Sequence, residues 1–131
     1  MQSLNSVDIV AMVALLQYLH FGSLVGKARG KYGVKAPAVT GAEPFERIYR
    51  VQMNTLELLV CLLPGLYISA KYWPATYVAA IGAIYLVGRV VYWRAYVGGT
   101  PRSLGFFLSV GPAYALVLAA LVPALLGKSA A

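Results

Sequence analysis

Four long apolar stretches constrain what this chain can fold into. They cover about residues 7–25, 48–70, 74–97 and 104–126, and a helix needs roughly 20 residues to cross the hydrocarbon core of a bilayer. Backbone N–H and C=O groups inside lipid must be bonded within the segment, so these stretches are predicted to be helices rather than strands. Short connections make sequential helices antiparallel neighbours. The predicted fold is an all-α membrane protein, a single integral membrane domain (1–131) built as an antiparallel four-transmembrane-helix bundle.

The amino-acid composition argues against the water-soluble classes of protein. Apolar residues make up 60% of the 131 and charged residues only 11%, where a soluble domain carries about 25% charge. A soluble core of this size cannot hide that much apolar material. The single cysteine, Cys61, can form neither an intramolecular disulfide nor a zinc site. A soluble enzyme, a disordered chain and a secreted disulfide scaffold are therefore disfavoured, and no metal is expected.

The distribution of Lys and Arg predicts how the chain lies in the membrane. A net charge of +7 would suggest nucleic acid in a soluble protein, but in a membrane protein basic residues first set the orientation. Lys71 and Lys128 belong to one side, and the other nine belong to the opposite side. We therefore expect a cytoplasmic basic loop (26–46), both termini on the opposite side, and no nucleic-acid partner. The nine are Lys27, Arg29, Lys31, Lys35, Arg47, Arg50, Arg89, Arg94 and Arg102.

Polar side chains form a stripe inside the second span. An ionisable residue within a span is costly, so Glu57 is a candidate for function. Arg50, Asn54 and Glu57 are spaced i, i+4 and i+7, which places them on one face of a helix. Such a stripe is predicted to face a neighbouring helix or a polar cavity rather than lipid.

The third span carries a second stripe at the same end of the membrane. Arg89, Tyr92 and Tyr96 are spaced i, i+3 and i+7, and Arg102 follows just beyond the span. Together the two stripes could form one pocket that holds both signs of charge and hydroxyl donors. Such a pocket suits a small zwitterion with excess negative charge.

Spacing alone leaves a simpler interpretation open. Arg50 and Glu57 could neutralise each other, and the other residues could follow the usual pattern of basic and aromatic residues at a membrane surface. This interpretation accounts for Arg89, Arg94 and Arg102 as orientation signals and for Tyr92, Trp93 and Tyr96 as an aromatic belt.

One continuous run resembles a known family signature. Residues 45–57 read Phe-Glu-Arg-Ile-Tyr-Arg-Val-Gln-Met-Asn-Thr-Leu-Glu, which is similar to the pattern F-E-R-hydrophobic-[FY]-R-A-Q-x-N-x-x-E of the MAPEG family (membrane-associated proteins in eicosanoid and glutathione metabolism). Val51 replaces the usual Ala. The resemblance covers nearly the whole chain, with four spans, a basic first loop, and two tyrosines spaced i, i+4 before Pro101-Arg102-Ser103.

The resemblance implies a homotrimer of four-helix subunits that binds glutathione between adjacent subunits near the cytoplasmic face. An arginine after the third span would stabilise the glutathione thiolate. Arg102 is the candidate, although a one-residue shift in the alignment gives its place to Ser103, which could donate a hydrogen bond to sulfur. The residues that match family positions contacting glutathione are Arg29, Arg50, Gln52, Asn54, Glu57, Tyr92 and Tyr96.

The chain also departs from the eicosanoid-making members. Leu58 stands where several of them have an aromatic residue, which argues against a dedicated leukotriene synthase. The compact length and the Thr-Leu-Glu core resemble bacterial members, so the expected location is the bacterial inner membrane, with the active site toward the cytoplasm.

The chemistry of glutathione matches the two stripes. Glutathione has two carboxylates, which suit Arg50 and Arg29, and one ammonium, which suits Glu57. The leading hypothesis is a membrane glutathione transferase whose thiolate attacks a hydrophobic electrophile in the bilayer. It leaves open a glutathione-dependent peroxidase activity on a lipid hydroperoxide. One alternative is a non-enzymatic lipid-binding scaffold of the same family. Another is a small four-span multidrug exporter, but those carry a glutamate in the first span, where this chain has Gln17 and His20.

Overall fold

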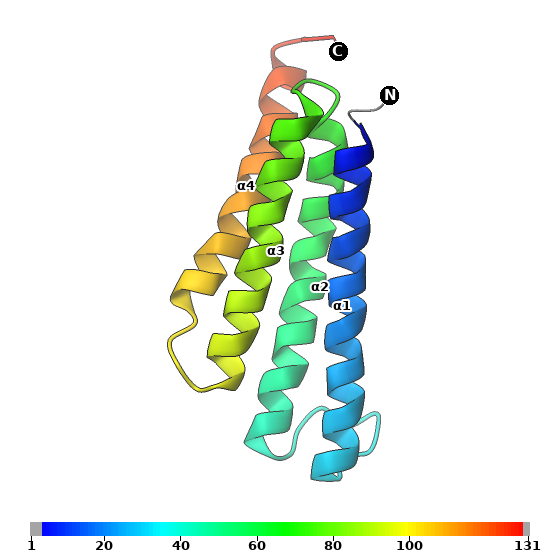
Figure 1. Ribbon diagram of the computed structural model, residues 1–131, viewed down its shortest axis with the longest axis vertical. Coiled ribbons are helices and arrows are strands. Elements are labelled where there is room, and N and C mark those ends of the chain that lie inside the picture. The colour runs from blue at the N-terminus through cyan, green and yellow to red at the C-terminus, as the bar shows by residue number, and fades with distance from the viewer. Residues whose placement is uncertain (1–3, 130–131) are drawn as a thin grey trace.

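Four antiparallel helices and their connecting loops make up the described part of the molecule. The computed structural model describes residues 4–129, and within that range the chain contains no strand. All four helices are long and apolar enough to cross a membrane, which confirms the predicted all-α membrane fold. The loops 33–42 and 98–102 lie at the same end of the bundle (Figure 1), called the basic end below. The helices are α1 (Leu4–Tyr32), α2 (Glu43–Ser69), α3 (Ala75–Val97) and α4 (Ser103–Leu125).

Helix α1 is longer than the predicted span 7–25. Residues 26–32, which the sequence analysis assigned to the basic loop 26–46, continue the helix. Lys, Arg and Ala in this stretch favour helix, and leaving the apolar stretch does not by itself end one. The helix stops before Gly33, whose φ of 68° lies in the left-handed region that glycine adopts readily. The predicted loop is therefore corrected to residues 33–42.

Helix α2 likewise begins before the predicted span 48–70. Pro44 lies in the first turn, where its missing N–H loses no helical bond. Glu43 and Glu46 in the same turn place negative charge at the positive end of the helix dipole. Glu46 also accepts a hydrogen bond from the backbone N–H of Gly41 at 2.9 Å. The apolar span is thus the later part of a helix that starts in the polar loop.

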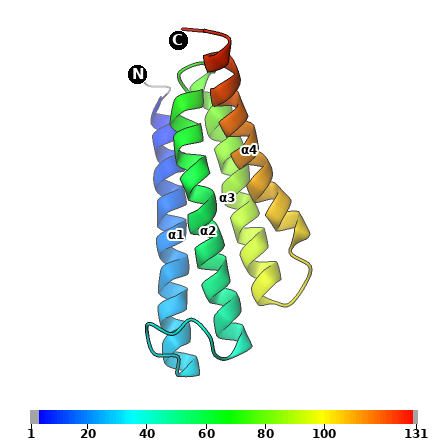
Figure 2. The same ribbon diagram turned by 180° about the vertical axis from the view of Figure 1, so that it is seen from behind.

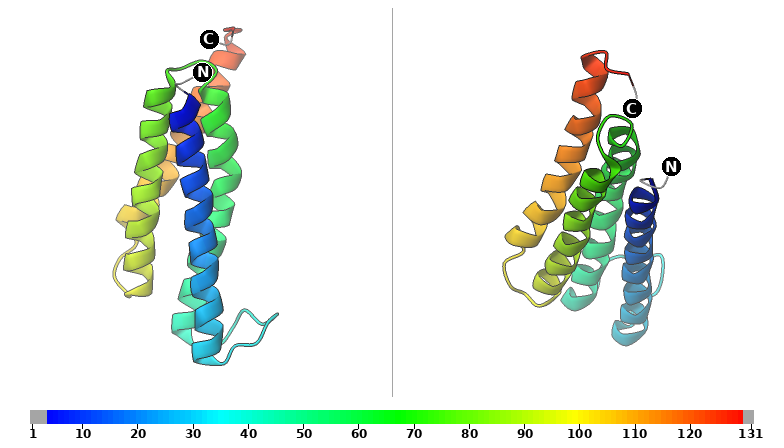
Figure 3. Two further views of the ribbon diagram at one scale, coloured as in Figure 1. Left: turned by 45° about the vertical axis from the view of Figure 1, so that its right-hand side comes forward. Right: turned by 45° about the horizontal axis from the view of Figure 1, so that its top comes forward.

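Helices α2 and α3 occupy the middle of the bundle. Each packs against all three other helices, whereas α1 and α4 lie on opposite sides, and their backbones do not come close to each other among the described residues (Figure 2, Figure 3). The predicted spans 74–97 and 104–126 agree with α3 and α4 to within one residue. The two central helices are the ones that carry the polar stripes.

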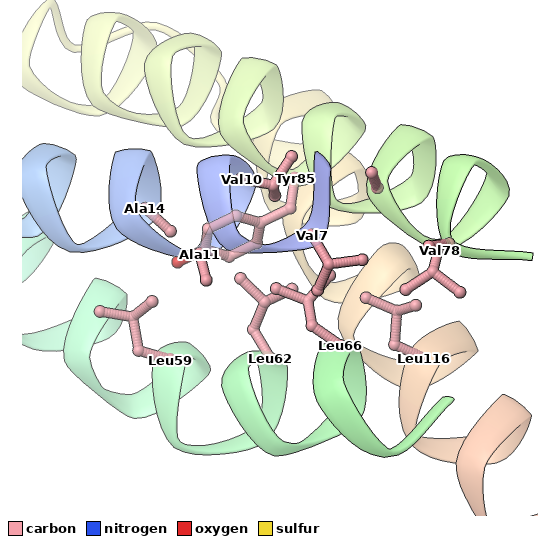
Figure 4. Packing of buried hydrophobic residues seen from close by; sticks show 12 residues of the cluster. Val7, Val10, Ala11, Ala14, Leu59, Leu62, Leu66, Val78, Tyr85 and Leu116 are labelled. Atoms are coloured by element: carbon pink, nitrogen blue, oxygen red, sulfur yellow. The ribbon is translucent and has the colours of Figure 1, made fainter. Parts of the chain in front are cut away.

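The main core lies between α1, α2 and α3. Side chains from these helices point toward one another, and Leu116 of α4 completes the cluster (Figure 4). Gln17 of α1 adds a polar link, because its Nε2 donates to the backbone oxygen of Leu86 in α3 at 3.0 Å. The buried cluster comprises Val7, Val10, Ala11, Ala14, Leu59, Leu62, Leu66, Ala75, Val78, Ala79, Tyr85 and Leu116.

Large apolar side chains also cover the outside of the helices. Leu16 of α1, Val60 of α2, Val87 of α3 and Phe107 of α4 are all well over half exposed. A soluble bundle would bury such residues or use them to bind a partner. Four membrane-length helices with an apolar exterior make this a multi-pass membrane protein.

Two glycines bring α3 and α4 together at the basic end. A Cβ atom on Gly105 would lie 2.3 Å from the backbone nitrogen of Tyr92, and one on Gly88 would lie 2.6 Å from the carbonyl carbon of Leu108. Neither position has room for a side chain. This backbone-to-backbone contact places the start of α4 directly beside Tyr92.

Candidate functional site

The stripe on α2 forms an accessible ion pair. Nη2 of Arg50 lies 3.3 Å from Oε1 of Glu57, and the two side chains are 48% and 57% exposed. The two residues therefore do neutralise each other, as the simpler interpretation proposed. An exposed ion pair contributes little to stability, so both partners remain free to exchange each other for charged groups of a ligand.

The stripe on α3 brings aromatic rings against arginines. The rings of Tyr92 and Tyr96 meet edge to face with centroids 5.4 Å apart. The guanidinium of Arg102, at the N-terminal boundary of α4, lies 5.0 Å from the Tyr96 ring centroid. Because the α3–α4 loop is short, Arg102 is held near the end of α3 from which the tyrosines project.

Two adjoining pockets open at the basic end, and they share Arg50, Tyr96 and Arg102. The first has a volume of about 560 Å³ and the second about 500 Å³, which is the size range of small-molecule sites. The first is further lined by Val39, Glu43, Glu46, Arg47, Tyr49, Gly99 and Thr100. The second is further lined by Asn54, Tyr92, Pro101, Ser103, Phe106 and Phe107.

The two pockets differ in character. The first pocket has three charged side chains besides the shared arginines, and two of them, Glu43 and Arg47, pair with each other. The second pocket adds aromatic side chains, Phe106 and Phe107, that are exposed on α4. A ligand could therefore place its charged groups in the first pocket and its reactive group in the second, beside the apolar surface of the protein.

Six of the nine predicted site residues line these pockets. The structure brings together Arg50, Asn54, Tyr92, Tyr96, Arg102 and Ser103. Arg102 and Ser103 are the two candidates for stabilising the thiolate. Arg102 lines both pockets, whereas Ser103 lines only the second.

Three predicted residues lie outside both pockets of the single chain. Glu57 adjoins them through its ion pair with Arg50. Arg29 holds the first loop, because its Nη1 donates to the backbone oxygen of Ala38 at 2.6 Å and its guanidinium lies 5.1 Å from the Phe45 ring centroid. Gln52 faces α1, where a Cβ atom on Gly22 would come within 2.9 Å of its Nε2.

Arg89 is a site-adjacent residue that sequence reasoning does not place. Helical spacing put Arg89 on the stripe of the third span, but it was not among the predicted site residues, and it is fully buried. Its Nη1 donates a 2.7 Å hydrogen bond to Oδ1 of Asn54, across the α2–α3 interface. The available signal was its position on the same stripe as Tyr92 and Tyr96, well inside the span.

Two apolar pockets follow the groove between α2 and α4. They have volumes of about 390 and 320 Å³ and share Cys61 and Val117. The nearer one includes Leu58 and Val110, which lie one residue beyond Glu57 and about one turn beyond Phe107. The groove therefore leads from the polar site along the membrane-facing side of the bundle.

A sequence model of the MAPEG family matches residues 7–122. The chain belongs to the MAPEG family. Microsomal glutathione S-transferase 2 of Homo sapiens is 35% identical over 103 residues, which cover 78% of this chain and 70% of the human protein. Leukotriene C4 synthase of Cavia porcellus is 31% identical over 118 residues, covering 88% and 79%.

A third MAPEG relative is an uncharacterized protein of Synechocystis, 44% identical over 115 residues that cover 87% of this chain and 84% of the relative. Family membership confirms the resemblance drawn from residues 45–57, and it agrees with four membrane-length helices. Within the described residues 4–129, no group of three or more His, Cys, Asp or Glu side chains could hold a metal ion.

Proposed function

We propose that this MAPEG protein is a membrane glutathione transferase. The observation that carries the proposal is the pair of adjoining pockets joined by Arg50, Tyr96 and Arg102. The first pocket offers charged partners to a tripeptide. The second places the guanidinium of Arg102 beside the aromatic side chains of Phe106 and Phe107. Relatives named as a glutathione transferase and a leukotriene C4 synthase support it.

Binding exchanges one ion pair for two new ones. Arg50 releases Glu57 and donates to a carboxylate of glutathione, and Glu57 accepts from its ammonium group. Their present separation of 3.3 Å and high exposure make this exchange cheap. The charged ends of glutathione then fix its thiol toward the second pocket.

Arg102 is the proposed thiolate-stabilising residue. A thiol with a pKa of about 8.5 is only about 3% ionised at pH 7, and lowering that pKa by two units requires about 2.7 kcal/mol of preferential stabilisation of the thiolate. A guanidinium that lines both pockets can supply it. Ser103, at the first turn of α4, adds a hydroxyl donor on the second pocket's side.

The acceptor reaches the thiolate from the lipid. In conjugation the sulfur forms a bond to an electrophilic carbon, and the leaving group departs with the bonding electrons. For a lipid hydroperoxide, two glutathione molecules are oxidised to their disulfide while the peroxide becomes an alcohol and water. The apolar groove along α2 and α4, around Cys61 and Val117, holds the apolar part of either acceptor.

The proposed assembly is a homotrimer with glutathione between subunits. Arg29 and Gln52 line neither pocket of their own chain, and in the trimer they serve a site shared with the neighbouring subunit. The proposed location is the bacterial inner membrane, with the basic end in the cytoplasm because nine of the 11 Lys and Arg residues gather toward it.

The test is conjugation of chlorodinitrobenzene by the purified protein in detergent. Arg102→Ala should lower turnover by about tenfold or more while glutathione still binds. Arg94→Ala is the matched control, since Arg94 is exposed on α3, stacks on Trp93 and lines neither pocket. Full turnover by Arg102→Ala together with loss in Ser103→Ala would transfer the role to Ser103. Tight fatty-acid binding with no glutathione affinity would favour the lipid-binding scaffold instead.

A further inference from the structure

Arg89 carries a buried positive charge directly behind the second pocket. Its side chain is fully buried between α2 and α3, and its guanidinium carbon lies 4.3 Å from the ring centroid of Tyr92. The chain has four Asp and Glu residues, and all of them are exposed. Among the described residues, therefore, no buried carboxylate neutralises Arg89.

The hydrogen bond from Arg89 decides which way the Asn54 amide faces. A guanidinium has only donors, so the amide atom that meets its Nη1 at 2.7 Å must be the oxygen. The amide nitrogen of Asn54 is then left for other partners. Asn54 lines the second pocket, and within residues 4–129 no protein acceptor takes that nitrogen.

We propose that Arg89 is a positioning residue that makes Asn54 a hydrogen-bond donor into the second pocket. The donor would meet an oxygen or the thiolate sulfur of glutathione, and it could not serve the ammonium group. The inference rests on the proposed function, since it assigns the direction of the hydrogen bond at Asn54, one of the residues expected to contact glutathione. Packing alone does not explain Arg89, because an apolar side chain would fill the same space without the cost of burying a charge.

A double-mutant cycle tests whether Arg89 acts through Asn54. Glutathione affinity is measured by calorimetry, and stability by thermal unfolding, for Arg89→Leu, Asn54→Ala and the double variant. Arg89→Leu should weaken glutathione about tenfold in the wild-type background and less than about twofold when Asn54 is already Ala. Arg89→Lys, which keeps the charge and a donor, should recover part of the affinity. Tyr85→Phe is the control, because it removes a buried polar atom one turn away on α3.

Asn54→Asp provides a second test that does not depend on removing Arg89. The carboxylate keeps an oxygen for Arg89, so the unfolding midpoint should be maintained or rise. It no longer offers a donor to the pocket, so glutathione should bind at least about tenfold more weakly. Unchanged or tighter binding by Asn54→Asp would overturn the inference, as would equal losses from Arg89→Leu in both backgrounds. If the wild-type protein binds no glutathione, the proposed function fails and this inference fails with it.

Discussion

Glu57 is the residue whose position most needs a ligand to explain it. It lies on the exposed side of α2 inside a membrane-length helix, with Arg50 as its ion-pair partner at 3.3 Å. A carboxylate at such a place is costly in lipid. Neutralisation by Arg50 lowers that cost, and the position is explained if the carboxylate binds the ammonium group of a ligand.

Glu57→Gln should weaken glutathione about tenfold, because the neutral amide loses the charge-assisted hydrogen bond to the ammonium group. N-acetylglutathione, which lacks the ammonium charge, should bind the wild-type protein and Glu57→Gln equally. Calorimetry with both ligands measures this, with Asp8→Asn at the far end of α1 as the control. A loss of the same size for both ligands would show that Glu57 does not bind the ammonium group.

The candidate site could be predicted from sequence where polar residues interrupt an apolar span. Helical spacing put Arg50 and Asn54 on one face of the second span and Tyr92 and Tyr96 on one face of the third, and the structure places all four at the pockets. Arg89 could not be assigned in the same way, because its burial depends on how closely α2 approaches α3. The roles of the site residues remain predictions that only ligand-binding experiments test.

The contact between α3 and α4 is the element that shapes the site. Gly105 has no room for a Cβ atom against Tyr92, so it lets the start of α4 lie close to the tyrosines of α3. Its importance was not predictable from sequence, since glycine is common in membrane helices and only the packing shows which one is needed.

Gly105→Ala should force α4 away from α3, destabilising the protein by about 1–3 kcal/mol and lowering conjugation. Gly111→Ala is the matched control on the same helix, where nothing lies within 4 Å of the added Cβ atom. That variant should be neutral or slightly stabilised, because alanine favours helix over glycine. Thermal unfolding in detergent compares the two, and equal behaviour would contradict the close-packing account.

Helix ends were harder to predict than helices. The apolar stretches located α3 and α4 to within one residue, but α1 and α2 continue into polar sequence at the basic end. Hydropathy measures the part of a helix that lies in lipid, whereas local signals mark the helix ends: Gly33 follows α1, and Pro44 lies in the first turn of α2. The first loop is shorter than predicted for that reason.

At the scale of the whole molecule, the four helices make a scaffold whose outer surface needs lipid. Apolar residues form 60% of the chain, and many of the largest remain exposed on the isolated bundle. Six of the predicted site residues gather in one region between α2, α3 and α4, namely Arg50, Asn54, Tyr92, Tyr96, Arg102 and Ser103. Arg29 and Gln52 lie outside that region in one chain, which is what the proposed trimeric site requires.

Mixed trimers test this arrangement. Arg29→Ala and Arg102→Ala subunits should each give little activity alone. If Arg29 serves the neighbouring site, random co-assembly should restore about a quarter of the sites, because each restored site needs one subunit of each kind in the right order. Conjugation by the co-expressed variants measures this. Activity no higher than the average of the two separate variants would place Arg29 in its own chain's site or limit it to holding the first loop.

The most direct test of the central claim is a glutathione titration followed by ultraviolet thiolate absorbance in detergent at pH 7. The wild-type protein should show a saturable thiolate signal, because bound glutathione is ionised far beyond the few per cent expected in water. Arg102→Ala should bind glutathione with little thiolate, and Arg94→Ala should match the wild type. Absence of saturable binding, or a full thiolate signal in Arg102→Ala, would contradict this account of the site.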